Sequence, residues 1–172
     1  MNEKNQIVNI IQEKVKDFKG LPNYEIDKDD RDERDERIKR AHLIEEFVAK
    51  KIEEITGYKC ELDTRQDDRL NRLYGDFLIR HNYYDDYSDI RVELKVAIPN
   101  KPKNLLGTIN LNTLDTFGHQ SNYYYLLINN DGTKYLFINS KKLYNNRGKL
   151  NYEDKYITTY EIEKLYKKTD LK

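Results

Sequence analysis

Residues 90–98 read IRVELKVAI and fix the expected architecture of the surrounding chain. Apolar side chains stand at every second position: Ile90, Val92, Leu94, Val96 and Ile98. Successive side chains of a β-strand point to opposite faces, so this spacing predicts a strand with five apolar residues on one face. Glu93 and Lys95 then share the other face. The strand therefore sets a carboxylate and an ammonium group side by side.

Composition limits the classes of protein to which the chain can belong. Its 172 residues fit one domain with a substantial core, and 31 basic residues balance 31 acidic ones. No overall field would draw the chain to nucleic acid or membrane, so a polyanion site would have to be a local patch. Cys60 is the only cysteine, no signal peptide is seen and no apolar run is long enough to span a membrane. These features predict a cytoplasmic protein without a membrane partner.

Two helices are predicted before the first strand. Residues 3–18 carry one narrow apolar stripe, and Gly20, Leu21 and Pro22 end that helix. This helix could serve as a dimer contact or cover the core. A charged run, residues 27–40, leads into a long amphipathic helix that ends near Gly57. The charged run is typical of a solvated helix face, although its arginines could contact a phosphate backbone.

The remaining elements predict an α/β fold with a mixed central sheet flanked by helices. Strands are expected at 58–62, 73–80, 90–98, 123–129 and 134–139, a short helix at 110–120, and a last helix from Tyr160. Ser140 could cap a short helical turn. The segment YYYLLIN (123–129) is too apolar for an edge strand. No repeat or linker interrupts the sequence, so residues 1–172 are expected to form one domain.

A second carboxylate is expected near Glu93. Asp76 opens the strand GDFLIR, and antiparallel pairing with 90–98 could bring it beside Glu93. Two close carboxylates repel each other unless a hard cation such as Mg²⁺ lies between them. Lys95 would suit a site that handles phosphate, since it can hold an attacking water or neutralise charge on phosphorus oxygens.

This pattern resembles the PD-(D/E)XK nucleases, which include restriction endonucleases and Holliday-junction resolvases. Their motif is an aspartate on one core strand, then an acidic residue, any residue and a lysine on the next, here Asp76, Glu93, Leu94 and Lys95. Gly75 stands where the motif often has proline. The order of elements over residues 33–130 also matches. The resemblance implies a restriction endonuclease-like core and an endonuclease that binds Mg²⁺ or Mn²⁺ through Asp76, Glu93 and the Leu94 carbonyl.

The same resemblance implies an acidic residue from the preceding helix, and Glu45 and Glu46 are the candidates. Glu45 lies at the edge of the apolar stripe of that helix, whereas Glu46 lies on its lysine-rich side. An acid at the edge of a buried stripe needs a partner, which a metal or Lys95 would supply. We therefore expect Glu45 to complete the catalytic and metal-binding set, with Glu46 as the alternative.

Further residues are assigned less direct roles. Gln120 is a possible helper, because related recombination exonucleases carry a glutamine and a tyrosine after the lysine; Tyr124 lies in a strand and has no such support. Lys101 and Lys103 follow the motif strand and could contact phosphate. The three histidines are too scattered for a zinc site, and Cys60 fits a core position.

The expected function is thus a metal-dependent endodeoxyribonuclease acting as a homodimer, since each active site of such enzymes cuts one strand. The high content of Asn, Lys, Ile and Tyr is typical of an AT-rich genome, such as that of a phage, an archaeal virus or a low-GC host. It does not discriminate between functions. Alternatives remain open. Exposed strands often alternate Glu and Lys, so the motif could be accidental, or the chain could be a non-catalytic binding module with a nuclease-like sheet.

Overall fold

The computed structural model describes residues 3–14, 33–62, 76–81, 89–97, 105–129, 132–158 and 160–164, with the backbone alone for 33–40. Gly75, Lys101 and Lys103 lie outside the described residues, as do residues 15–18 of the first predicted helix. Within this part of the chain, no helix is both long enough and apolar enough to cross a membrane.

The described strands form a mixed central sheet, as the sequence predicts. Its order is β1-β2-β3-β5-β6, and only the central pair β3–β5 is parallel. The bounds are β1 Lys59–Leu62, β2 Phe77–Arg80, β3 Ile90–Val96, β5 Tyr123–Ile128 and β6 Tyr135–Asn139. Every residue of β5 is buried, as expected for a central strand covered on both faces.

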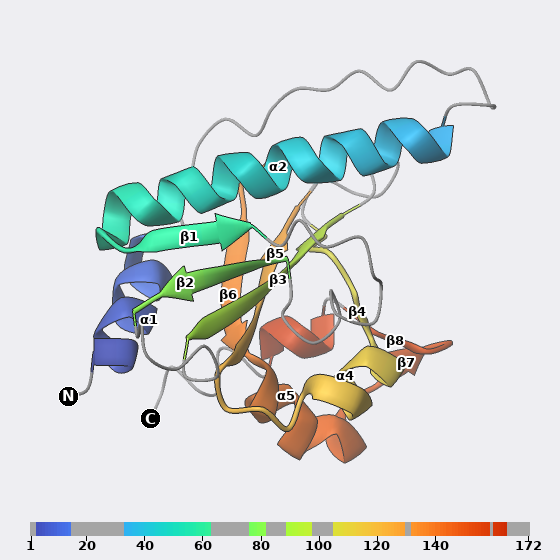
Figure 1. The fold of residues 1–172 in the computed structure, drawn as a ribbon. Coiled ribbons are helices and arrows are strands. Elements are labelled where there is room, and N and C mark those ends of the chain that lie inside the picture. The colour runs from blue at the N-terminus through green and yellow to red at the C-terminus, as the bar shows by residue number, and fades with distance from the viewer. Residues whose placement is uncertain are drawn as a thin grey trace.

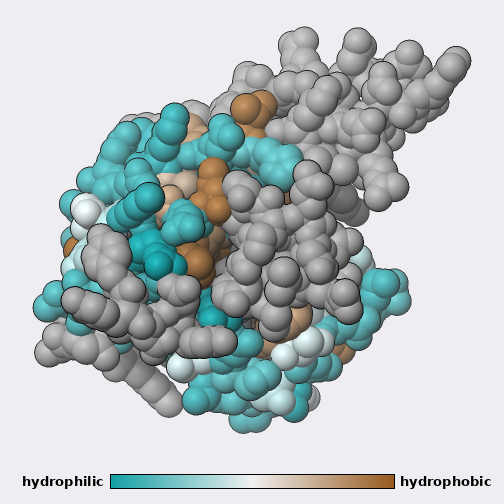
Figure 2. Space-filling view, in the orientation of Figure 1, coloured by the Kyte–Doolittle hydropathy of each residue, from teal (hydrophilic) through white to brown (hydrophobic). Residues whose placement is uncertain are grey.

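Helices α1 (Glu3–Lys14) and α2 (Glu33–Thr56) cover one face of the sheet (Figure 1). The predicted apolar face of β3 packs here, with Ile90, Val92 and Leu94 in one cluster with Ile44, Val48 and Ile52 of α2 and with Cys60. Ile7 and Ile11 of α1 are fully buried in the same cluster. The apolar stripe of α1 thus covers the core, which is one of the two roles expected for it. Figure 2 shows hydrophilic residues over α2 and hydrophobic ones in a hollow beneath it.

The opposite face is covered by α4 (Leu111–Phe117) and α5 (Ser140–Asn146). Three short strands missed by the sequence patterns, β4 (Ile109–Asn110), β7 (Tyr152–Glu153) and β8 (Tyr156–Ile157), form a second sheet. Each has two residues, too few to show a period of two. The cap of α5 is Asn139, whose side chain accepts the Lys141 N–H, rather than Ser140. Residues 160–164 are helical, as predicted, and the Glu161 N–H donates to Thr158 Oγ1.

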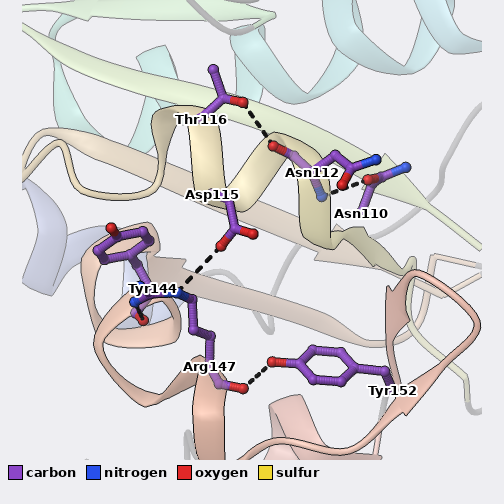
Figure 3. Close-up of polar contacts among 7 residues, drawn as sticks. All are labelled: Asn110, Asn112, Asp115, Thr116, Tyr144, Arg147 and Tyr152. Carbon is purple, nitrogen blue, oxygen red and sulfur yellow. Dashed lines mark hydrogen bonds and ion pairs between the residues drawn. The ribbon is translucent and has the colours of Figure 1, made fainter.

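Arg147 joins the elements of this second layer (Figure 3). Its Nε lies 3.3 Å from Asp115 Oδ1 on α4, and its guanidinium stacks 3.8 Å from the centre of the Tyr144 ring on α5. Its carbonyl accepts the hydroxyl of Tyr152 on β7. One arginine therefore ties the two helices and the hairpin into a unit that covers the second face of the sheet.

Gly107 lies directly against the backbone of Lys95 in β3. A Cβ at this position would meet the backbone carbon and oxygen of Lys95 at 2.5 Å, closer than real Cβ atoms approach other atoms. The Gly107 N–H also donates to the Ile128 carbonyl of β5. The missing side chain is therefore what lets this segment pass directly against the backbone of Lys95.

We predict that Gly107→Ala lowers the free energy of unfolding by about 1–3 kcal/mol, because the added methyl group forces the backbone of β3 or its neighbour to shift. Urea denaturation followed by circular dichroism would measure this. Gly148→Ala is the matched control, since a Cβ at Gly148 meets no atom within 4 Å; we expect roughly 0.5 kcal/mol or less there. Equal effects of the two substitutions would contradict the close-approach explanation.

Candidate functional site

The site forms where strand β2 stops pairing with β3. Phe77 pairs with Val92, and the N–H of the preceding residue, Asp76, donates to the Val92 carbonyl (2.8 Å). Two residues further along β3, the Leu94 N–H donates to Asp76 Oδ2 (2.6 Å). A side-chain carboxylate thus takes the place that a backbone carbonyl of β2 would occupy, and Asp76 is held at the end of the ladder beside Glu93.

Glu93 and Lys95 lie on the same side of β3, as the period of two predicts. Lys95 Nζ lies 2.9 Å from Glu93 Oε1, and the two side chains are 38% and 15% exposed. The other oxygen, Glu93 Oε2, accepts the hydroxyl of Tyr123 on β5 (3.1 Å). The more deeply buried carboxylate therefore has a donor on each oxygen, while the lysine reaches toward solvent.

Glu45, on α2, lies close enough to this group for its charge to act on Asp76 and Lys95. Glu45 is 18% exposed at the edge of the buried stripe, and its Oε2 lies 3.3 Å from His42 Nδ1. Burial raises the pKa of Glu45, His42 opposes that rise, and the charges of Glu93 and Lys95 act on it as well. Glu46 is exposed and lies with Lys50 and Glu53 in a shallow pocket against β1.

Glu93 and Glu45 destabilise the charged form of Asp76. Burial raises the pKa of Asp76 well above its ordinary range, and the charges of Glu93 and Glu45 raise it further. The Leu94 N–H and Lys95 oppose this rise without cancelling it. Burial by itself would lower the pKa of Lys95, but Glu93, Asp76 and Glu45 outweigh it, so that pKa is raised. The arrangement is one ammonium group whose charge acts on three neighbouring carboxyl groups.

Other predicted residues fall elsewhere. Among the described residues, Gln120 makes no hydrogen bond with the four groups of the site, Asp76, Glu93, Lys95 and Glu45. Its Oε1 accepts a hydrogen bond from Arg91 Nη1 (3.0 Å), and Arg91 precedes Glu93 on the same face of β3. Tyr124 points to the α2 side of the sheet, where it stacks on Phe137 with ring centres 4.8 Å apart. In the described part of the chain, no group of three or more His, Cys, Asp or Glu side chains is arranged to hold a metal.

Sequence patterns missed Tyr123. Three consecutive tyrosines begin β5, and only the register of the parallel β3–β5 pair decides which of them faces Glu93. Tyr123 and Tyr125 lie on the site's side of the sheet and Tyr124 on the other. Alternation alone would have grouped the first and third, but it would not have shown which strand lay beside β3.

We predict that Asp76→Asn stabilises the fold at neutral and alkaline pH. Asparagine keeps an oxygen to accept the Leu94 N–H and removes a carboxylate that burial and two acids disfavour. Because the pKa of Asp76 is higher in the folded than in the unfolded chain, wild-type stability falls as pH rises between the two values. The advantage of the variant should therefore be full above the folded pKa and vanish below the unfolded pKa.

Thermal denaturation of both proteins across a pH series would test this, with Glu13→Gln, at an exposed acid of α1, as control. An advantage of Asp76→Asn that does not depend on pH would argue against a destabilised carboxylate at this position.

Comparison with known proteins adds no relative from which this site could be interpreted. No family model matches the chain, and neither a curated protein nor a solved structure matches it.

Proposed function

We propose that the chain is a metal-dependent nuclease that hydrolyses phosphodiester bonds, most simply an endodeoxyribonuclease with a PD-(D/E)XK-like core. The observation that carries the proposal is the meeting of Asp76, Glu93 and Lys95 at the end of the described β2–β3 ladder. The sequence resemblance predicts these residue types on these two strands. Their convergence with Glu45, which comes from a separate helix, is what a chance Glu-Lys alternation on a solvated strand would not supply.

The residues present suit a hard divalent cation. Asp76 and Glu93 offer carboxylate oxygens, and Glu45 adds a third acid close enough to affect Asp76. The N–H and C=O of a strand residue point to the same side, so the Leu94 carbonyl faces the edge where its N–H meets Asp76. Mg²⁺ is commonly held by one or two carboxylates together with water and substrate phosphate, so a cage of three acids is not required.

A bound Mg²⁺ or Mn²⁺ would supply Lewis acidity, lowering the pKa of a water and neutralising charge near phosphorus. The protein residues supply the rest. Lys95 keeps its ammonium charged through its ion pair with Glu93, and its exposed end can orient the attacking water or stabilise the developing phosphorane charge. Asp76, anchored to the backbone of β3, cannot swing away from the reacting phosphate.

A second candidate is a non-catalytic module that binds nucleic acid or protein. The observation that favours it is the Glu93–Lys95 ion pair, because it gives the acid a cationic partner without a metal. In that case the cluster would be a structural ion-pair network. The two candidates differ in whether the site takes up a divalent cation and cuts.

We predict that the purified protein cuts DNA only with a divalent cation. Plasmid, branched DNA and RNA would be incubated with Mg²⁺, Mn²⁺ or EDTA, and products resolved on gels. Conversion of plasmid to nicked or linear forms with either metal, and none with EDTA, is expected. Direct linearisation would support the homodimer that we propose, in which each site cuts one strand. Binding without cutting under every condition would support the non-catalytic module.

We predict that Lys95→Ala lowers the cleavage rate by at least about 100-fold while most DNA binding remains, because the lysine acts on charge that develops during the reaction. Lys95→Met retains the aliphatic stem and controls for lost packing around Glu93. Lys142→Ala removes an exposed lysine of α5 and should leave the rate unchanged. Full cleavage by Lys95→Ala would remove this residue from the mechanism.

A further inference from the structure

Glu93 is fixed from two directions. Lys95, on the same strand, approaches Oε1 at 2.9 Å, and Tyr123, on the neighbouring strand, donates its hydroxyl to Oε2 at 3.1 Å. Lysine has a long flexible stem, and this one is 38% exposed. The tyrosine has two rotatable side-chain bonds and no exposed surface. The fixed donor is therefore the tyrosine.

The surroundings of Tyr123 leave its hydroxyl little freedom. Its ring lies nearly parallel to Phe117 of α4, with centres 6.3 Å apart and a 13° interplanar angle, and meets Tyr125 edge-on at 5.7 Å. Its backbone lies in the parallel ladder opposite Arg91. Packing on α4 and pairing with β3 thus fix the direction of the Tyr123 hydroxyl. Because this hydroxyl donates to Glu93 Oε2, it also fixes the orientation of the Glu93 carboxylate.

We propose that Tyr123 is the positioning residue for Glu93, holding the carboxylate in the orientation in which it binds a divalent cation. The inference rests on the proposed nuclease function. A hydroxyl that donates to one oxygen of a ligating carboxylate restricts rotation of the carboxylate and leaves its other lone pairs for the ion. Loss of such a supporting hydrogen bond costs about 10–100-fold in metal affinity at known sites.

Tyr125 provides an internal comparison on the same strand. It faces the same side as Tyr123 and is fully buried, but its hydroxyl has no hydrogen-bond partner among the described residues. This layer therefore accommodates a buried tyrosine hydroxyl without a carboxylate. Burial of a tyrosine in this layer therefore does not by itself require a carboxylate partner. The two tyrosines differ in the hydrogen bond to Glu93, which Tyr123 makes and Tyr125 does not.

The test compares Tyr123→Phe with Tyr125→Phe in the full chain. Each substitution removes one buried hydroxyl and keeps the ring. Isothermal titration with Mn²⁺ should show affinity about 10–100-fold weaker for Tyr123→Phe and within about twofold of wild type for Tyr125→Phe. Urea denaturation in EDTA should distinguish the two hydroxyl deletions. Glu93→Ala, which removes the acceptor of the Tyr123 hydroxyl, should change the effect of Tyr123→Phe on the midpoint and leave that of Tyr125→Phe unchanged.

A second measurement uses only the wild-type chain, so it does not require that the Tyr123→Phe variant folds. In the wild-type chain labelled with ¹³C-tyrosine, the Cζ resonance of Tyr123 should shift when Mg²⁺ is added, and more than that of Tyr125. Equal shifts for the two, equal Mn²⁺ affinity of wild type and Tyr123→Phe, or an equal loss in both variants would each overturn the role of Tyr123. A wild-type chain that neither binds Mn²⁺ nor cuts would instead overturn the proposed function itself.

Discussion

The hydrogen bond from the Leu94 N–H to the Asp76 carboxylate is the contact on which the site depends. It ends the β2–β3 ladder with a side chain in place of a backbone carbonyl. In doing so it keeps Asp76 beside Glu93 at the end of the described β2–β3 pairing. The N–H is satisfied, as a buried donor must be, but the acceptor carries a charge in a poorly solvated place.

That choice of acceptor has a consequence for stability. A carboxylate that burial and two neighbouring acids all disfavour lowers the stability of the folded chain at neutral pH. The two apolar layers hold the strands in register, so Asp76 cannot relieve the repulsion by moving away. Strongly perturbed pKa values are common at functional sites, and structural ion-pair networks produce them as well. The lysine relieves part of the repulsion and a divalent cation would relieve more.

Sequence patterns predicted the parts of this structure that follow from strong periodicity. The alternation in 90–98 placed Glu93 and Lys95 on one face, and the helical stripe before Gly57 placed Glu45 at the edge of the buried face, with Glu46 kept as the alternative. Gln120 was a possible helper at the site, but its side-chain oxygen accepts a hydrogen bond from Arg91, on the same face of β3. The short strands β4, β7 and β8 form through pairing between distant segments, which two-residue patterns do not encode.

The tyrosines of β5 show why register carries the remaining information. Tyr123, Tyr124 and Tyr125 are chemically identical, yet the pairing of Arg91 with Tyr123 puts the first and third on the side of Glu93 and stacks the second on Phe137. A slip of one residue would reverse all three. Such a slip would also bring Leu126 to the layer that Leu127 now fills, so packing on both faces opposes it. The hydroxyl that reaches Glu93 is thus selected by the apolar residues that follow it along the strand, not by any property of the tyrosine itself.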